Sequence, residues 1–380
     1  MNLSSFNNEI VKRFHLSGNL CAVFCQDYDK LDLEGTKIYQ FSGTLFSKMA
    51  RLLSTFKSII GWTERMIYEK LFDYFILKKI KLDETDVIFF LRATSPNLCK
   101  KASKKGIRIE GMISTYPREL IKDRIIEQEK LWGVKEYSDY TNQRRIKEYY
   151  KILQYWNNII SLSGSNIVQE EMLKVKGFEN VLFPTEEFGV NRLLFKYLAR
   201  DHSVSDKDEI IYLVTTDGTL KKGLLPFMSA WEEFYSNHDK VKLQVVGDPG
   251  NSIKRVLTAK FSLESIEFVG YVNNLHEYYH NANVYICPSI IDMGPRTIKQ
   301  AMACGKFVIA SRQCGASAFI TSYVDGLTYD INNIKELVNC LKWSFENRLR
   351  IDEIGKKASD KSFQFDNDRF ANNIYNLVTG

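Results

Sequence analysis

Short apolar runs alternate with amphipathic stretches along most of this chain. In the C-terminal half the apolar runs lie near residues 210–214, 242–246, 266–269, 284–287 and 307–310. In the N-terminal half the expected strands lie at 20–24, 37–41, 86–91 and 106–113. Helical periodicity fits the stretches 8–16, 51–80, 118–132 and 143–156. Strands that alternate with helices predict an α/β protein with parallel sheets and helices on both faces.

Two such series of elements predict two Rossmann-like domains. With 380 residues the chain is long enough for two domains of ordinary size. We place the N-terminal domain at 1–190 and the C-terminal domain at 206–363, joined near 189–205. Ligands of such sheets bind beyond the carboxyl ends of the strands, so the expected site is a cleft between the two domains.

The segment 284–311 carries the most specific pattern of the chain. An apolar run ends at Pro288-Ser289, and Asp292 follows shortly after it. Pro295 then opens an expected helix that Gly305 ends, which is the usual punctuation of a helix. The free backbone N–H groups of residues 294–297 and the helix dipole favour an anion. This pattern suits a phosphorylated ligand.

The same segment, PSIIDMGPRTIKQAMACGKFVIAS, resembles the donor-site signature of family 4 retaining glycosyltransferases of the GT-B fold. Asp292 falls on the first Glu of that signature and Gln300 on the second, with no gap in the spacing. Segments 217–231, 242–250 and 265–289 resemble the preceding elements of the family in the same order, and 161–195 resembles its last N-domain strand, helix and linker. The resemblance implies that residues 364–380 form a last helix that packs back toward the N-terminal domain.

What the resemblance implies about the site can be stated residue by residue. Asp292 would contact the donor sugar or stabilise charge at its anomeric carbon, and Lys222 would pair with the donor diphosphate, so both are the expected catalytic residues. The expected donor-binding residues are Gly247, Ser289, Gly294, Pro295, Arg296, Thr297 and Gln300. The donor would be a nucleotide-diphosphate sugar, and neither a metal nor another cofactor is expected.

Each of these residues also has a structural interpretation. Asp292 is a favoured cap of the following helix, and Lys222 could be a solvated surface charge. The positive charge of Arg296 in the first turn of a helix is unfavourable for the helix dipole. Either a bound anion or an ordinary surface ion pair would explain an arginine at this position. Gly247 suits the approach of a ligand and equally any tight turn. Gln300 can be an ordinary polar helix residue.

The chain also departs from the family pattern at several places. Thr215, Thr216 and Asp217 occupy the region of the family's Gly-Arg pair, and Ala318 falls near a family Glu. The stretch 109–120 offers Ser114, Thr115 and Tyr116 where the family often has a His. The start, MNLSSFNNEIVKRFHLSGNL, resembles the family's first helix, so its first strand and glycine loop are expected to be reduced.

These observations leave three functions open. The leading one is a glycosyltransferase that moves a sugar, with retention, to a glycan or lipid-linked acceptor in polysaccharide or glycoconjugate biosynthesis. The departures favour a second: a GT-B protein that binds a nucleotide sugar or a partner enzyme without turnover. A nucleotide-sugar epimerase is the third, and it needs further acid/base residues in the cleft.

Composition and charge indicate where the protein is located in the cell and which classes of partner it can bind. Seven cysteines without paired spacing argue against a zinc or disulfide framework, and no signal peptide or long apolar run is present, so we expect a cytoplasmic protein. The net charge of +6 does not by itself indicate nucleic acid. Segment 51–81 is rich in Lys, Arg and aromatic residues, and segment 99–108 adds five basic residues. Such segments are typical of docking on the inner face of an anionic membrane, and also of a helix with a solvated basic face.

Overall fold

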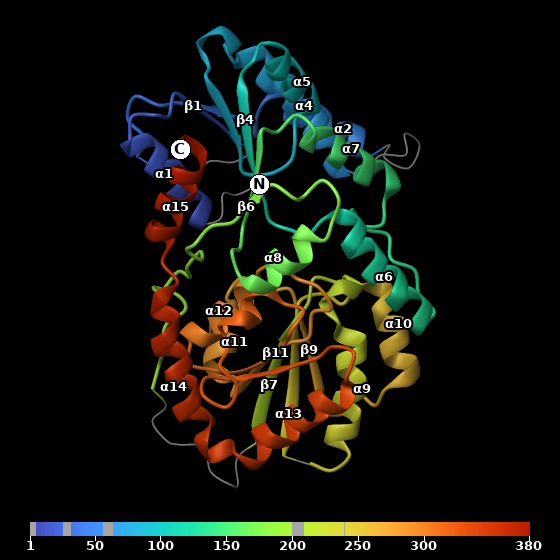
Figure 1. Cartoon of the computed structure of the whole chain (residues 1–380). Coiled ribbons are helices and arrows are strands. Elements are labelled where there is room, and N and C mark those ends of the chain that lie inside the picture. Colours follow the sequence, from blue (N-terminus) through green and yellow to red (C-terminus); the bar gives the residue numbers. More distant parts are fainter. Residues whose placement is uncertain (1–4, 26–31, 56–63, 200–208, 239) are drawn as a thin grey trace.

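The structure is a computed structural model, and it describes residues 5–25, 32–55, 64–199, 209–238 and 240–380. The described elements form an α/β fold whose sheets are all parallel, as the alternation of the sequence predicts. Two parts lie one above the other, the N-terminal part in blue and green and the C-terminal part in yellow and red (Figure 1).

The C-terminal part is built on a six-stranded parallel sheet with the order β12-β11-β10-β7-β8-β9. Its strands are β7 (Ile210–Thr215), β8 (Val241–Val246), β9 (Ile266–Gly270), β10 (Val284–Cys287), β11 (Phe307–Ser311) and β12 (Leu327–Tyr329). Five of them lie where the apolar runs predict strands. The sixth, β12, has three residues, too few to give a recognisable run.

Helices cover both faces of this sheet because alternate residues of each strand point to opposite sides. In β7, Tyr212 packs with α9 (Leu224–Tyr235) and α13 (Ile334–Glu346), whereas Leu213 packs in a second cluster with α12 (Arg296–Ala303). The remaining helices of this part are α10 (Gly250–Lys260), α11 (Leu275–Asn281) and α14 (Ile351–Lys361). The sheet is therefore doubly wound.

The N-terminal part contains a four-stranded parallel sheet and a separate two-stranded one. The larger sheet has the order β3-β4-β5-β6, with β3 (Val87–Phe90), β4 (Arg108–Ile113), β5 (Asn158–Ser161) and β6 (Val181–Leu182). The strands β1 (Ala22–Cys25) and β2 (Lys37–Gln40) pair with each other in their own ladder. The described chain begins with α1 (Ser5–Leu16), so a helix precedes β1.

The helices of this part agree with the sequence expectations except at two segments: the segment 51–80, and a helix over 96–104 that was not expected. The helices are α2 (Leu45–Ser54), α4 (Glu64–Lys79), α5 (Pro96–Lys104), α6 (Arg118–Trp132), α7 (Gln143–Leu153) and α8 (Asn166–Leu173). The expectation that a helix starts at residue 51 was wrong, because α2 already begins at Leu45. The Thr44 hydroxyl caps this helix by accepting a hydrogen bond from the N–H of Ser47 at 3.2 Å. Residues 56–63 of the segment 51–80 lie outside the described part.

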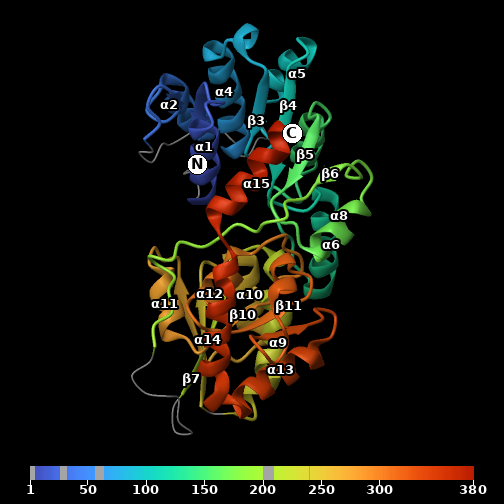
Figure 2. The ribbon, with the colours of Figure 1, turned by 60° about the vertical axis from the view of Figure 1, so that its left-hand side comes forward.

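The last helix, α15 (Asn367–Thr379), leaves the C-terminal part and lies along α1 (Figure 2). The rings of Phe14 and Tyr375 meet edge to face at 5.0 Å, and Asn19 donates to the Tyr375 hydroxyl at 2.6 Å. At the far end, the Arg108 guanidinium donates to the carbonyl of Val378. This helix therefore ties the end of the chain to the N-terminal part.

Candidate functional site

The two residues expected to be catalytic lie in direct contact. Lys222 ends a short 3-10 turn after β7 (Leu220–Lys222), and Asp292 lies between β10 and α12. Lys222 Nζ donates to Asp292 Oδ2 at 2.7 Å, and the two side chains are 20% and 15% exposed. The fold thus joins, at the carboxyl ends of two neighbouring strands, residues that are 70 positions apart.

Both members of this pair are held in their charged forms. Burial alone would raise the pKa of Asp292, but the charges of Lys222 and Lys221 outweigh it, so the pKa of Asp292 is lowered. Burial would lower the pKa of Lys222, but Asp292 and Asp217 outweigh it, so the pKa of Lys222 is raised. The pair therefore contributes to stability between the ordinary values of 3.8 and 10.5, and the contribution is lost as pH falls through the lowered pKa of Asp292 or rises through the raised pKa of Lys222.

Close backbone packing fixes Lys222 beside the Asp292 loop. The N–H of Ile290 donates to the carbonyl of Lys221 at 2.8 Å. Gly223 has a φ of +68°, and a Cβ at that position would lie 1.8 Å from the carbonyl oxygen of Pro288. Glycine is thus required here both by its left-handed backbone and by the approach of the neighbouring loop.

We expect Gly223→Ala to destabilise the protein more than Gly133→Ala does. Gly133 has the same φ of +68° but nothing lies within 4 Å of its would-be Cβ, so it isolates the backbone strain, worth about 1–2 kcal/mol. The alanine at 223 adds a clash that pushes Lys222 away from Asp292. Urea denaturation of both variants measures the difference, and equal losses of unfolding free energy would contradict the packing described here.

The backbone of Asp292 is anchored to the loop after β11. Its N–H donates to the carbonyl of Gln313 at 3.3 Å, and the N–H of Gly315 donates to its carbonyl at 2.8 Å. Its Oδ1 also accepts from the N–H of Gly294 at 3.3 Å. Asp292 thus forms a local turn with Gly294 and holds Lys222, but the expectation that it caps the following helix was wrong, because Pro295 precedes α12 and the helix start has no side-chain cap.

The helix that follows begins one residue later than expected. Pro295 is the residue before the helix, with an extended backbone (ψ of 111°), and α12 starts at Arg296. The Arg296 side chain is exposed, and Thr297 and Gln300 are half-buried on α12. Ser289 is buried instead, and its Oγ lies 3.7 Å from the Sγ of Cys287. The expected donor-binding residues therefore share one end of the sheet but differ in their access to solvent.

Gly247 follows β8 and meets the turn after β7. Its φ is +106°, and a Cβ would lie 1.9 Å from the carbonyl oxygen of Thr216. Its N–H donates to the carbonyl of Gly270 at 2.7 Å. The contact with Thr216 accounts for a glycine here, so the sequence signal at Gly247 is explained by packing as well as by ligand approach.

The N-terminal part reaches the same place through the loop after β4. Tyr116 is 1% exposed, and its hydroxyl has no hydrogen-bond partner among the described residues. Burial, followed by the charges of Cys314 and Asp292, raises the pKa of Tyr116 well above its usual value. A Cβ added at Gly294 would lie 3.4 Å from the ring of Phe188, so Phe188 packs closely against this loop. The loop that holds Asp292 is thus enclosed from both parts of the protein.

One family model matches the part of the chain that contains this site. The match covers residues 197–361, and the matching family is described as glycosyl transferases group 1. The matched region contains Lys222, Asp292 and all of α12.

Curated relatives match shorter segments. A lipopolysaccharide 1,2-N-acetylglucosaminetransferase of Salmonella typhimurium is 31% identical over 119 residues, which are 28% of this chain and 30% of that protein. An N,N'-diacetylbacillosaminyl-diphospho-undecaprenol alpha-1,3-N-acetylgalactosaminyltransferase of Campylobacter jejuni is 24% identical over 151 residues, 38% of this chain and 40% of that protein. The matches therefore span less than half the length of these relatives.

Solved structures match the whole fold. Anabaena HepE in complex with UDP and glucose superposes with a TM-score of 0.66 at 14% identity, covering 100% of this chain and 96% of that one. A sucrose-phosphate synthase from Thermosynechococcus elongatus gives a TM-score of 0.66 at 16% identity, covering 97% and 90%. This chain therefore has the GT-B fold.

Two of the departures from the family pattern, Asp217 and Ala318, lie in the matched region. Asp217 accepts from the N–H of Thr219 at 3.2 Å and lies 3.9 Å from Lys221 Nζ, and its charge also raises the pKa of Lys222. Ala318 is exposed in the 3-10 turn Gly315–Phe319.

Among the described residues, no group of three or more His, Cys, Asp or Glu lies close enough together to hold a metal ion.

A buried ion pair beside the site was not anticipated from the sequence. Lys299 of α12 is fully buried, and its Nζ donates to Glu187 Oε2 at 2.7 Å and to the carbonyl of Phe188 at 3.1 Å. Glu187 Oε1 in turn accepts from the Ser163 hydroxyl at 2.6 Å. The signal was available: Lys299 lies three positions before the buried Met302, on the apolar side of the helix.

Proposed function

We propose that this protein is a glycosyltransferase that moves a sugar from a nucleoside-diphosphate sugar to a glycan or lipid-linked acceptor. The observation that carries the proposal is the contact between Lys222 and Asp292 at the start of α12, within the group 1 domain. In the proposal the domains are 1–190 and 206–363, and residues 364–380 link them.

Each element of the site has a chemical task in this reaction. Negative charge grows on the diphosphate as the bond from its oxygen to the anomeric carbon breaks. Lys222, whose raised pKa keeps it protonated, and the first N–H groups of α12 would stabilise that charge. The departing phosphate oxygen takes the proton of the acceptor hydroxyl, which bonds to the anomeric carbon on the same face, so configuration is retained. Asp292 would orient the ammonium group and offset positive charge on the sugar.

The relatives support the classes of substrate. The printed names of two of them state transfer in lipopolysaccharide and to a diphospho-undecaprenol-linked sugar, and the HepE structure contains UDP and glucose. By this analogy we propose a nucleotide sugar as donor and a glycan or lipid-linked acceptor, in the biosynthesis of polysaccharides or glycoconjugates. We further propose that no metal is required, because Lys222 and the helix N-terminus supply the positive charge that a cation would otherwise supply.

Release of nucleoside diphosphate tests the proposal. The protein is incubated with UDP-, GDP- and ADP-sugars and an extract of glycans and lipid-linked glycans, with EDTA or with magnesium, and the diphosphate is measured by chromatography. We expect release from one donor at equal rates in EDTA and magnesium, and a product with the donor's anomeric configuration by NMR. A chain that binds a nucleotide without releasing diphosphate from its sugars would instead be the non-catalytic binder.

The non-catalytic alternative has one specific observation in its favour. Lys222 is already neutralised by Asp292, so a donor diphosphate must share the lysine with that carboxylate. The two functions predict the same dependence of binding on Lys222 but differ in turnover. Only measured release of diphosphate therefore separates them.

We also propose that the protein docks peripherally on the cytoplasmic face of an anionic membrane. Among the described helices, none is long and apolar enough to cross a bilayer. Exposed apolar residues lie on α2, which overlaps the start of the segment 51–81: Leu45, Met49, Leu52 and Leu53 share one face of the helix. Exposed lysines of α5 and the turn after it add positive charge: Lys100, Lys101, Lys104 and Lys105.

Vesicle co-sedimentation tests this docking. We expect the protein to bind vesicles that contain phosphatidylglycerol more tightly than vesicles of phosphatidylcholine alone. Because burying one leucine side chain is worth about 1.5–3 kcal/mol, the double change Leu45→Ser and Leu52→Ser should lower the affinity more than about tenfold. Leu131→Ser, at an equally exposed leucine of α6, is the matched control. Equal losses in both variants would exclude α2 as the docking face.

A further inference from the structure

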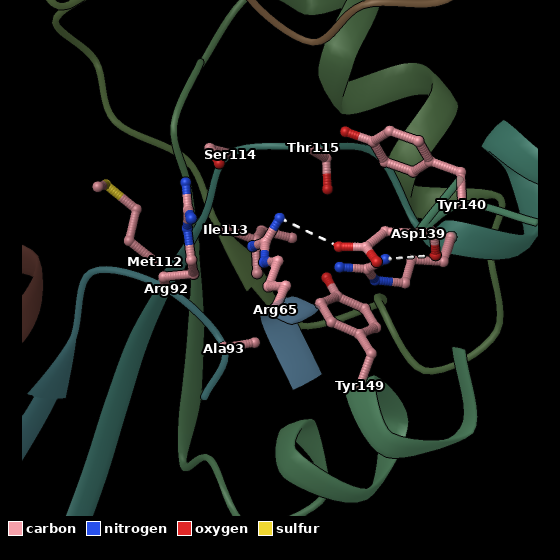
Figure 3. A pocket seen from close by; sticks show the side chains of 11 residues that line it. Arg65, Arg92, Ala93, Met112, Ile113, Ser114, Thr115, Asp139, Tyr140 and Tyr149 are labelled. Atoms are coloured by element: carbon pink, nitrogen blue, oxygen red, sulfur yellow. Dashed lines mark hydrogen bonds and ion pairs between the residues drawn. The ribbon is translucent and has the colours of Figure 1, made fainter. Parts of the chain in front are cut away.

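A small cavity lies at the carboxyl ends of β3 and β4, apart from Lys222 and Asp292 (Figure 3). Its volume is about 110 Å³, well below that of sites that enclose a whole sugar nucleotide. Its lining is unusually cationic: it comprises Arg65, Arg92, Ala93, Met112, Ile113, Ser114, Thr115, Arg118, Asp139, Tyr140 and Tyr149. The cavity is thus sized for one small chemical group and is lined by three guanidinium groups and one carboxylate.

The acidic residues around the cavity do not balance the arginines. Arg65 donates to Glu69 at 3.0 Å and lies 3.2 Å from Asp139. Arg145 is also paired with Glu69, and Arg118 donates to the backbone carbonyl of Asp139 at 2.9 Å. Among the described residues, Glu69 and Asp139 form ion pairs with Arg65 and Arg145, and the cavity lining itself has three arginines and one carboxylate, Asp139.

Two polar groups of residues that line the cavity have no hydrogen-bond partner in the part of the chain that the structure describes. Tyr149 is 6% exposed and its hydroxyl has no hydrogen-bond partner among the described residues, and the same holds for the Nε of Arg118. Figure 3 shows the Tyr149 hydroxyl directed toward the side where Arg65 and Asp139 lie. Unsatisfied buried donors are rare in folded proteins, so their presence points to a ligand.

The remaining arginine is at the mouth of the cavity. Arg92 is exposed there, and desolvation together with the neighbouring charge of Arg65 lowers its pKa to about 10. An anion placed between these two arginines would reverse this effect, because an opposite charge favours the protonated form. Guanidinium groups match phosphate oxygens through paired hydrogen bonds, and arginine clusters are a common means of phosphate recognition.

The cavity is next to the donor site. Tyr140, which lines it, has its ring 5.4 Å from Lys221 Nζ, the residue before Lys222. Ser114 and Thr115 also line it, and the next residue, Tyr116, is the buried side chain that senses the charge of Asp292. A group in the cavity would thus be one loop away from Asp292 and from the sugar that it would contact in the proposed reaction.

We propose that this cavity binds a phosphate group carried by the acceptor substrate, which rests on the proposed transferase function. The phosphate would be held by Arg65, Arg92 and Arg118 and would accept a hydrogen bond from Tyr149. The acceptor is then either a phosphorylated lipid or a phosphorylated glycan, since both present the same group. The cavity positions the acceptor rather than taking part in bond making.

Titration calorimetry with small probes tests the proposal without nucleotide. The probes are glucose 6-phosphate and geranyl phosphate, with glucose, geraniol and glucuronate as neutral or carboxylate counterparts. We expect at least one phosphate to bind more than about tenfold tighter than its counterparts, and the tighter phosphate identifies a glycan-borne or lipid-borne group. Binding of glucuronate as tight as that of glucose 6-phosphate would overturn the assignment to phosphate.

Variants locate the bound group. Arg92→Gln should weaken the phosphate probe at least about tenfold, whereas Arg255→Gln, at an exposed arginine of α10, should not. Tyr149→Phe should leave the melting temperature unchanged or higher, because it removes an unsatisfied hydroxyl, and yet weaken the probe several-fold. Loss of probe binding in Lys222→Ala but not in Arg92→Gln would place the phosphate in the donor site and refute the proposal. If the phosphate probe binds in the cavity but no nucleotide binds the protein, the transferase function is refuted and the phosphate site remains.

Discussion

Lys222→Ala is expected to lower kcat/KM for the sugar donor by about 100- to 1,000-fold, the usual effect of losing one group that stabilises developing charge. In the structure Lys222 contacts Asp292 at 2.7 Å, and its raised pKa keeps it protonated at neutral pH. Removing it deletes the cation nearest the expected diphosphate and leaves the Asp292 carboxylate without its partner. The decrease should appear in steady-state assays of diphosphate release at several donor concentrations.

A surface pair of the same type provides the control. Lys254 and Asp248 lie 2.8 Å apart, but their side chains are 51% and 67% exposed. Lys254→Ala should change unfolding free energy by less than about 1 kcal/mol and leave kcat/KM unaltered. The double change Lys222→Ala and Asp292→Asn should recover stability without recovering turnover. If the single variant at 222 keeps wild-type kcat/KM, Lys222 has no part in the reaction.

Glu187→Gln is expected to lower the unfolding free energy by about 3–5 kcal/mol, because it leaves the ammonium group of Lys299 buried without a counter-charge. The two groups lie 2.7 Å apart, and Lys299 is fully buried. Burial already lowers the pKa of Lys299, and Glu187 opposes this. In the variant the loss should become smaller as pH rises toward 10.5, since a neutral Lys299 needs no partner. Urea denaturation over a range of pH measures both effects.

An exposed pair again separates the specific effect from a general one. Glu353 and Lys357 of α14 lie 2.7 Å apart with side chains 61% and 52% exposed. Glu353→Gln should leave the unfolding free energy nearly unchanged, because an exposed ion pair contributes little to stability. The double change Glu187→Gln and Lys299→Met should regain most of the stability that Glu187→Gln loses. An unfolding free energy of Glu187→Gln equal to that of Glu353→Gln would show that the buried pair is not required.

The periodicity of the sequence was sufficient for most of the C-terminal sheet because its central strands are largely buried. β7, β10 and β11 read as almost continuous apolar runs, which is typical of strands in doubly wound sheets, whereas β8 alternates apolar residues with Lys242 and Gln244. The start of α2 was missed because its boundary depends on the Thr44 cap rather than on periodicity. The separate ladder of β1 and β2 was missed because strand pairing is a tertiary property that no local pattern specifies.

The site was partly predictable for a similar reason. Lys222 and Asp292 could be named because each belongs to a local motif, but their contact depends on the sheet order that places β7 beside β10. The link between Glu187 and Lys299 joins residues 112 positions apart and has no motif. The arginine-lined cavity draws residues from α4, α6 and α7 and from the ends of two strands, so only the folded chain brings them together.

The measurement that tests the central claim most directly is titration calorimetry of the purified protein with UDP, GDP and ADP, compared between wild type, Lys222→Ala and Lys254→Ala. We expect saturable binding of one nucleotide to wild type and to Lys254→Ala, unaffected by EDTA, and an affinity at least about tenfold weaker in Lys222→Ala. Absence of binding of every nucleotide to wild type at millimolar concentration, or equal affinity in all three proteins, would contradict a donor site at Lys222 and Asp292.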